Sequence, residues 1–528
     1  MSQRPRRLLL TALLALTGLA AVWFWWPQPT YQGRTLQGWL NQPVNPADGE
    51  AEIATGEAIR HFGAEAIPEL LAELQDKTWR ARLWQLDDWL FRNSNRKFKL
   101  MSAEYRQAMQ AEDAFYVLGE LADPAVPALA KLAEGTNDTV QLRAMSALAN
   151  IGTSNAWHAL VSLQTSTNPS AKIWTSWAWG RPGALKRPNH ALVPRLSQLA
   201  TNRDPEVSRI AMLDLASVAA APELVVPWAT NRLASSSYPQ AWLGVHLPPY
   251  GLAASAAGPM LSNLLQAPTP VHDQADLREA LTGIQREVRQ GAIIRGPRSR
   301  RELALLFTGH EFAEGGDTIL KALAKHDAHA SFFLTGAFLT NAAFQPLIQR
   351  MCAGGHYLGI HSDAHLLYCS WERPPRTLVT AWQFRVDVDR NFEKLARFRW
   401  QAPSAREHYY DRLFVPPYEH WNDDIADWSR DRGLQLLNFT PGTRANADYT
   451  EEGASNYVSS QAIFDSILAR ERQDPDGLNG FLLLLHLGAG PKRTDKFHDR
   501  LDELLTELSA KGYRFARVDT LLAPREGE

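Results

Sequence analysis

The hydrophobic pattern of this 528-residue chain changes its period near residue 300, and this change limits the folds open to it. Before it, apolar residues recur at helical spacing in segments separated by short turns. After it, short apolar runs alternate with longer amphipathic segments, and three such runs cover residues 303–307, 330–334 and 481–485. Runs of this length fit strands, and alternation of strand and helix is typical of a parallel sheet buried on both faces. The sequence predicts an N-terminal helical region followed by a C-terminal α/β domain.

A proline followed by a leucine-rich stretch recurs through residues 31–292. Four clear copies and a weaker fifth are separated by 59, 67, 33 and 32 residues, with prolines at positions 68, 127, 194, 227 and 259. Proline is tolerated in the first turn of a helix, where its missing N–H would have no partner. A period in the thirties predicts an α-solenoid, and the region resembles HEAT repeats. Two hypotheses remain open for it: a spacer, or a concave surface that binds a protein or glycan partner.

Residues 1–30 predict a membrane anchor. Arg4, Arg6 and Arg7 precede the uncharged run Leu8–Trp26, which at helical rise is about 28 Å long, close to the ~30 Å hydrocarbon core of a bilayer. The arginines favour the cytoplasmic side. The alternative is a cleaved signal peptide, because Gly18–Ala20 offers small residues at the required spacing. Both hypotheses place the rest of the chain on the periplasmic or extracellular side.

Composition excludes one class of partner. The formal net charge is -2, whereas a nucleic-acid-binding protein needs a strongly basic surface. Cys352 and Cys369 are too few for a disulfide framework. Six arginines crowd residues 286–301, which we interpret as a solvated linker. We therefore expect three parts: residues 1–30, 31–292 and 293–528.

Polar residues follow the predicted strands of the last part. His310 and Glu311 follow the first strand, His361 and His365 follow a later one, and His486 ends the last. The carboxyl ends of parallel strands converge on one edge, where chemistry is normally housed. Histidines four residues apart lie side by side on one helical turn, so we expect this pair to bind one divalent metal. Neutral nitrogen ligands favour zinc or a similar transition ion.

Residues 302–522 resemble the polysaccharide deacetylase family, also described as the NodB homology domain or carbohydrate esterase family 4. The matching motifs are His361-Ser362-Asp363-Ala364-His365, the strand leading to His486, Ala330–Gly336, Pro416-Pro417-Tyr418 and Asp448-Tyr449. The resemblance implies an irregular (β/α) barrel that binds one divalent metal and removes acetyl groups from N-acetylated sugars.

The chain departs from the family at the end of the first strand. Where the family has Thr-Phe-Asp-Asp-Gly, residues 308–312 read Thr-Gly-His-Glu-Phe. Aligned on the threonine, His310 takes the place of the base aspartate and Glu311 that of the metal aspartate. A register two residues earlier would place Thr308 and Gly309 there instead.

A second departure accompanies the first. The arginine that precedes the proline motif in the family is replaced by Val415. An arginine keeps an aspartate base ionised, but beside a histidine it would depress the pKa. A carboxylate orients a histidine base better, and we expect Glu419 to orient His310.

The resemblance and the motifs together predict hydrolysis by metal-activated water in an exported, carbohydrate-active domain. The predicted roles are metal ligation by Glu311, His361 and His365, general base for His310, general acid for His486, and substrate binding for Tyr418, Glu419, Trp421 and Asp448. The expected metal is zinc and the expected substrate a cell-envelope polysaccharide. Two alternatives stay open: hydrolysis of O-acetyl esters, and a membrane-tethered glycan- or protein-binding scaffold whose deacetylase-like domain is inactive.

Overall fold

The computed structural model describes residues 29–41, 49–75, 103–163, 165–168, 171, 193–234, 244, 246–266, 271–399 and 412–524. The predicted membrane anchor, residues 1–30, lies almost entirely outside these ranges. Within them no single helix has the length and apolar character needed to cross a membrane. Helices α12 (Pro205–Ser217) and α13 (Pro222–Ala234) pass that test only as a pair bent by 114°.

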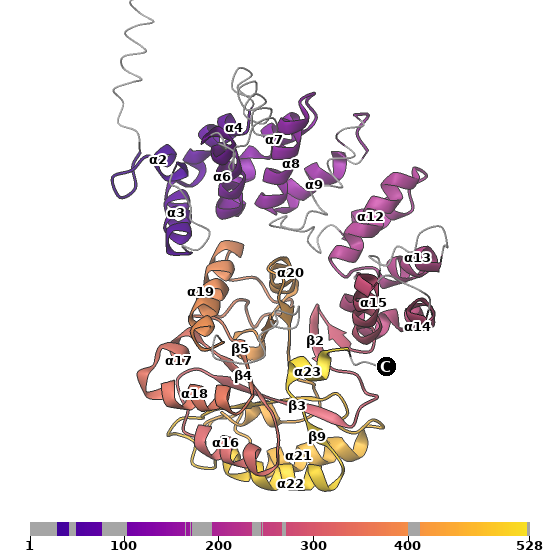
Figure 1. Cartoon of the computed structure of the whole chain (residues 1–528). Coiled ribbons are helices and arrows are strands. Elements are labelled where there is room, and N and C mark those ends of the chain that lie inside the picture. The colour runs from indigo at the N-terminus through magenta and orange to yellow at the C-terminus, as the bar shows by residue number, and fades with distance from the viewer. Residues whose placement is uncertain are drawn as a thin grey trace, which may run out of the picture.

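The N-terminal region is helical, as predicted, and curves over one side of the C-terminal domain (Figure 1). Its other helices are α2 (Leu36–Leu40), α3 (Gly49–Phe62), α4 (Ile67–Leu74), α6 (Ala103–Leu118), α7 (Val126–Ala133), α8 (Asp138–Ile151), α9 (Ser154–Leu163), α11 (Val193–Ala200), α14 (Gly258–Gln266) and α15 (Val271–Gly283). Their buried faces form a continuous apolar core. The assignment of these helices to HEAT-like repeats stays a prediction.

The recurring prolines begin helices at four of their five positions. Pro68 and Pro127 lie in the first turns of α4 and α7, and Pro194 and Pro259 are the second residues of α11 and α14. Pro227 is different, because α13 already begins at Pro222 and Pro227 lies inside it. The prediction of a helix start is wrong at that copy.

The predicted linker at residues 286–301 is instead a folded hairpin. Strands β1 (Glu287–Arg289) and β2 (Ala292–Arg295) pair antiparallel. Arg295 is fully buried, forms a 2.6 Å ion pair with Asp474, and donates to the carbonyls of Asn479 and Gly477. The interpretation as a solvated basic run is wrong for Arg286, Arg295 and Arg300, which are buried, whereas Arg289 and Arg301 are exposed. A buried guanidinium such as that of Arg295 is stable only through charged and polar partners.

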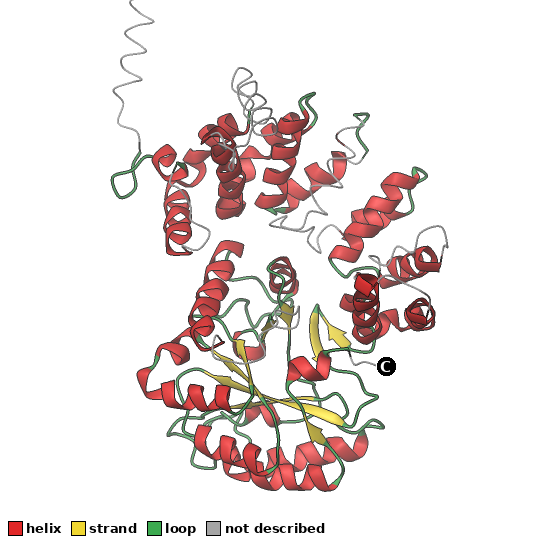
Figure 2. Ribbon diagram, viewed as in Figure 1, coloured by secondary structure: helices red, strands yellow, loops and turns green. Residues whose placement is uncertain are grey.

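The C-terminal domain is built on a parallel sheet, as the alternating pattern predicted (Figure 2). Its strands are β3 (Glu302–Gly309), β4 (Ser331–Leu334), β5 (Tyr357–Ile360), β6 (Leu413–Phe414), β7 (Gln435–Leu436), β8 (Leu482–His486) and β9 (Arg514–Phe515). The order is β7-β6-β5-β4-β3-β8, with β9 also paired to β3. Strand β2 bridges both edges, through Ile293 to Leu437 and through Arg295 to Phe481. This arrangement is consistent with an irregular (β/α) barrel.

Both faces of the sheet are buried. Along β3, Leu303, Leu305 and Phe307 join one apolar cluster, while Ala304 and Leu306 join another. This alternation follows from the two-residue period of a strand. The first cluster contains side chains of the surrounding helices, namely α16 (Gly316–Lys325), α18 (Gln345–Ala353), α19 (Ala381–Arg399), α20 (Asp423–Asp431), α21 (Ser460–Gln473) and α22 (Leu501–Ala510).

Helix α19 joins the two regions. Its first residues, Ala381 and Trp382, belong to the buried cluster of the helical region. A Cβ added to Gly56 of α3 would lie only 2.1 Å from the Trp382 ring, so the indole fits against bare backbone. The Tyr116 hydroxyl of α6 donates to the Ala381 carbonyl at 3.5 Å. The helical region is therefore packed directly onto the helix that also faces the sheet.

Candidate active site

Four histidines meet at the carboxyl edge of the sheet. His310 follows β3, His361 and His365 follow β5, and His486 ends β8. The rings of His310 and His365 are stacked, with centroids 4.3 Å apart and an interplanar angle of 19°. The centroids of His361 and His365 are 5.1 Å apart. Thr308 of β3 pairs with His486, so these two strands end at the same level.

The segment that carries the histidine pair is a loop, not the helical turn that we expected. Ser362 and His365 have φ angles of 70° and 52°, in the left-handed region that L-residues rarely adopt. The Ser362 hydroxyl accepts a hydrogen bond from the His365 N–H at 2.8 Å. Strained backbone of this kind is kept where the surroundings enforce it, and it gathers at functional sites.

One face of α19 holds this loop in place. Asn391 accepts from the His361 N–H at 3.0 Å, Asp387 accepts from the Ala364 N–H at 2.7 Å, and Lys394 forms a 2.7 Å ion pair with Asp363. Residues at 387, 391 and 394 are four and three apart and therefore share a helix face.

The two loop histidines are neutral. His361 Nδ1 lies 2.8 Å from the carbonyl oxygen of Val415, so Nδ1–H donates there and Nε2 keeps its lone pair. Burial, and next the neighbouring His365, keep the pKa of His361 well below its ordinary value. Burial, followed by the charges of His310 and His486, lowers the pKa of His365 to about 4. Neutral imidazoles of this kind have the chemistry of metal ligands.

The third predicted ligand does not join them. The Glu311 side chain is 68% exposed, and its carboxylate lies 3.9 Å from His310 Nε2. In the parts of the chain that the structure describes, no group of three or more His, Cys, Asp or Glu side chains is placed to hold a metal ion. The three-residue metal site therefore does not fit this arrangement and stays a prediction.

His310 contacts a hydroxyl rather than the expected carboxylate. Its Nδ1 lies 3.1 Å from Oγ1 of Thr335, the residue that caps helix α17 (Gly336–Thr340). Burial lowers the pKa of His310, and the charge of Glu311 opposes this. Glu419 interacts instead with His486 and Asp448. Burial raises the pKa of Glu419 to about 7, with His486 lowering it and Asp448 raising it.

His486 and Asp448 form a close pair. Nδ1 of His486 lies 2.6 Å from Asp448 Oδ1, and the His486 N–H donates to Oδ2 at 2.9 Å. Burial alone would lower the pKa of His486, but the charge and hydrogen bond of Asp448, with a smaller effect of Glu419, outweigh it and raise the pKa. The sequence placed Asp448 in substrate binding, whereas its carboxylate lies against the imidazole.

Arg493 is a residue that sequence reasoning missed. It is fully buried and donates to the carbonyls of Thr450, Val458 and Asp495 at 2.7–2.9 Å. These bonds tie the loop after Asp448 to the loop after β8. A lone arginine in a polar stretch gives no sequence signal for this role.

Of the two aromatic residues predicted to bind sugar, one lies beside the histidines and the other does not. Tyr418 is 44% exposed, with its ring centroid 4.5 Å from that of His365. Trp421 donates its indole N–H to the Gln290 carbonyl in the β1–β2 turn and packs against the apolar cluster between the sheet and its surrounding helices. Its contacts therefore lie away from the histidines. Trp371, an exposed aromatic that the sequence did not single out, lies edge-on to Tyr418, and the exposed Tyr449 of the Asp448-Tyr449 motif has its ring 4.7 Å from His486.

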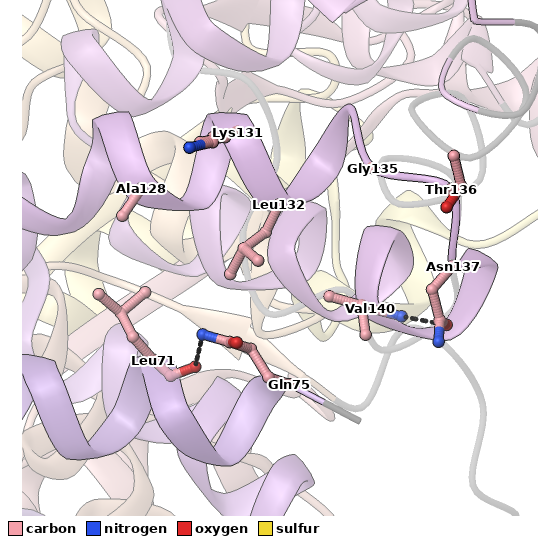
Figure 3. A pocket seen from close by; sticks show the side chains of 9 residues that line it. All are labelled: Leu71, Gln75, Ala128, Lys131, Leu132, Gly135, Thr136, Asn137 and Val140. Carbon is pink, nitrogen blue, oxygen red and sulfur yellow. Dashed lines mark hydrogen bonds between the residues drawn. The ribbon is translucent and has the colours of Figure 1, made fainter. Parts of the chain in front are cut away.

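A groove of about 510 Å³ opens elsewhere, between α4, α7 and the start of α8 (Figure 3). It contains none of the residues discussed above and is lined by Leu71, Gln75, Ala128, Lys131, Leu132, Gly135, Thr136, Asn137 and Val140. Lys131 is the single charged side chain among these residues, so the groove offers no acid–base pair.

Comparison with known proteins agrees with the motifs. Residues 296–437 match the family model described as polysaccharide deacetylase. The chain is 24% identical over 227 residues to the peptidoglycan-N-acetylglucosamine deacetylase of Bacillus cereus, covering 43% of this chain and 70% of the relative. It is 24% identical over 229 residues to the peptidoglycan-N-acetylmuramic acid deacetylase PdaA of Bacillus subtilis, covering 43% and 74%.

A solved structure of a peptidoglycan N-acetylglucosamine deacetylase aligns with 44% of this chain and 94% of its own, at 22% identity and a TM-score of 0.34. The family match and the curated relatives lead to one assignment. The C-terminal region of this chain contains a polysaccharide deacetylase domain.

Proposed function

We propose that this domain hydrolyses the acetyl amide of N-acetylated sugars in a cell-envelope polysaccharide. The observation that carries the proposal is that the pKa values of two histidines at one edge of the sheet are shifted in opposite directions. The pKa of His310 is lowered and that of His486 is raised. Titratable groups whose surroundings push their pKa values apart are the usual mark of an acid–base pair.

In the proposed reaction, neutral His310 accepts a proton from the attacking water. If Thr335 accepts from Nδ1–H, Nε2 of His310 is free to act as this base. His486, held as a cation by Asp448, then donates its proton to the departing amine nitrogen. The C–N bond breaks, and acetate and the free amine leave. An O-acetyl ester would follow the same course, with an alcohol leaving.

The proposal includes a divalent metal, zinc by ligand preference, on the neutral imidazoles of His361 and His365. Because the described residues supply no third side-chain ligand, no step of the reaction is assigned to it. We also propose that residues 1–30 anchor the protein, with the remainder outside the cytoplasm and the helical region free to bind a protein or glycan partner.

The test is acetate release from N-acetylated oligosaccharides by the full chain. We expect the parent to be active and His486→Ala to lose at least about a hundredfold in kcat, as is typical when a general acid is removed. His329→Ala is the matched control, because His329 is an exposed histidine that precedes β4 and so lies at the opposite edge of the same sheet. Activity of His486→Ala equal to the parent would contradict the proposal.

One observation favours a second function, an inactive glycan-binding domain on a membrane-tethered scaffold. Glu311, the intended metal ligand, is turned to solvent. This alternative predicts that the parent binds N-acetylated glycans but releases no acetate from any of them. Measured acetate release excludes it.

A further inference from the structure

Residues 369–377, here called the Trp371 loop, form a tight hairpin beside the histidines. The Ser370 N–H donates to the Arg376 carbonyl at 2.8 Å, and the Arg376 N–H donates to Ser370 Oγ at 2.9 Å. The Leu378 N–H donates to the Tyr368 carbonyl at 2.8 Å. The backbone of this loop is therefore held by its own hydrogen bonds.

The segment that follows Tyr418 fixes the Trp371 loop from outside. The Asn422 amide donates to Thr377 Oγ1 at 2.8 Å and to the Pro375 carbonyl at 3.4 Å. His420 Nε2 lies 2.8 Å from the Ser370 carbonyl oxygen, to which it donates. These hydrogen bonds from His420 and Asn422 thus hold the Trp371 loop in one position.

Trp371 occupies this tip with one face covered and one face free. Its ring is stacked on that of His420, with centroids 4.1 Å apart and an interplanar angle of 14°. The residue is nonetheless 64% exposed, the largest exposed fraction among the exposed large hydrophobic residues of the described chain. An indole held parallel to a ring behind it offers its outer face to a ligand without losing further rotational freedom.

The indole belongs to a row of rings that begins at the histidines. His310 stacks on His365, His365 lies 4.5 Å from Tyr418, and Tyr418 meets Trp371 edge-on at 6.4 Å between centroids. A polymer whose reacting sugar lies at the histidines would extend along this row toward Trp371.

We propose that Trp371 forms a separate sugar-binding position, stacking on the apolar C–H face of a pyranose ring in the same polysaccharide chain. The identity of the polysaccharide rests on the proposed function. Glu372, the residue after Trp371, forms an exposed ion pair with Arg376, whose Nε lies 2.6 Å from a Glu372 oxygen, and these groups offer acceptors and donors for sugar hydroxyls. Trp371 sets affinity for longer chains and takes no part in the bond-breaking step.

The test compares Trp371→Ala with the parent on N-acetylglucosamine oligomers from dimer to hexamer. Aromatic stacking is worth about 0.5–1.5 kcal/mol, so we expect KM for the hexamer to rise roughly two- to twelvefold. We expect kcat for every oligomer and KM for the dimer to stay as in the parent. Trp371→Phe, which keeps a ring, should recover part of the hexamer KM. Leu121→Ala removes an exposed apolar side chain from the helical region and serves as the control.

Binding measured apart from turnover separates the two proposals. Calorimetry of the hexamer, with His486→Ala as the reference protein, should show the same loss of affinity when Trp371→Ala is added. Binding that depends on Trp371, without acetate release by the parent, would contradict the proposed function and still support this sugar-binding position. Acetate release with an unchanged hexamer KM in Trp371→Ala would overturn the sugar position alone. Equal increases in KM for dimer and hexamer would also overturn it.

Discussion

The pKa values of the histidines in the site are shifted in opposite directions because of their partners, not because of their positions in the chain. His486 has a carboxylate at 2.6 Å, and its pKa is raised in spite of burial. His361 has a carbonyl oxygen at 2.8 Å, and its pKa is lowered by burial and then by His365, with His486 and His310 acting in the same direction. A negatively charged partner stabilises the imidazolium, whereas a neutral hydrogen-bond acceptor does not offset the free energy of burying its charge. An imidazole whose pKa is raised and one whose pKa is lowered thus lie at the same edge of the sheet.

The Asp448–His486 pair predicts a specific pH dependence. A raised pKa keeps His486 protonated to higher pH, so activity should fall on the alkaline side only above the ordinary histidine range. Asp448→Asn removes the charge that raises this pKa, so the alkaline limb of the kcat/KM profile should move to lower pH and kcat should fall. The exposed Asp465→Asn is the control. An alkaline limb that does not move would show that His486 is not the titrating acid.

Metal content tests the paired imidazoles. We expect the purified parent to retain a divalent metal and His361→Ala to lose it, because a single imidazole is a poor site. Elemental analysis after dialysis measures this directly, and treatment with a chelator should remove the metal from the parent. Equal metal in the parent and His361→Ala would place the ion elsewhere.

At the scale of elements, the histidine loop depends on α19. A loop with two left-handed residues cannot rely on regular backbone pairing, so side chains from a neighbouring helix take over its hydrogen bonds. Asn391 serves both sides, since it accepts from the His361 N–H and donates to the Leu334 carbonyl at 3.1 Å. The helix therefore links the ends of β4 and β5.

Substitution of Asn391 tests this link. Asn391→Ala leaves a buried N–H and a buried carbonyl without their partner, which costs about 1–3 kcal/mol in the free energy of unfolding. We also expect kcat to fall, because His361 loses its support. Urea unfolding and acetate release measure the two effects, with the exposed neighbour Arg390→Ala as the control. Unchanged activity in a destabilised Asn391→Ala would confine its role to folding.

At the scale of the whole molecule, the helical region and the deacetylase domain share a buried contact. Trp382 is 5% exposed and packs among helices of the N-terminal region, while residues further along the same α19 hold the histidine loop. One continuous helix, α19, thus runs from this junction to the histidine loop.

Trp382→Ala should destabilise the protein by about 3–5 kcal/mol, as expected for a large aromatic removed from a core. Because α19 then loses its fixed end, we expect kcat/KM to fall as well, even at temperatures where the variant is folded. Unfolding curves and acetate release measure both, and Glu393→Ala, on an exposed part of α19, is the control. A destabilised variant with full activity would mean that the two regions are packed together but not coupled.

Local pattern was enough to predict alternating strands and helices in the C-terminal domain. The apolar runs at 303–307, 330–334 and 481–485 lie in β3, β4 and β8, because the period of burial along a strand or helix is a property of neighbouring residues. The same logic brought His310, His361, His365 and His486 to one edge, since parallel strands end together.

The contacts between polar side chains far apart in the sequence could be known only from the folded structure. Asp448 meets His486 across 38 residues, Trp421 meets Gln290 across 131, and Arg295 meets Asp474 across 179. No local pattern distinguishes such a carboxylate, indole or guanidinium from a solvated one, which is why the arginine-rich stretch was mistaken for a linker and Glu311 was expected to turn inward. The amino-acid pattern alone predicted the helical region, the main alternation of strands and helices after it, and the histidines at the strand ends. Which polar groups are buried together depends on the tertiary fold. The free energy of burying a charge depends on its partners, and here these partners lie far away in the sequence.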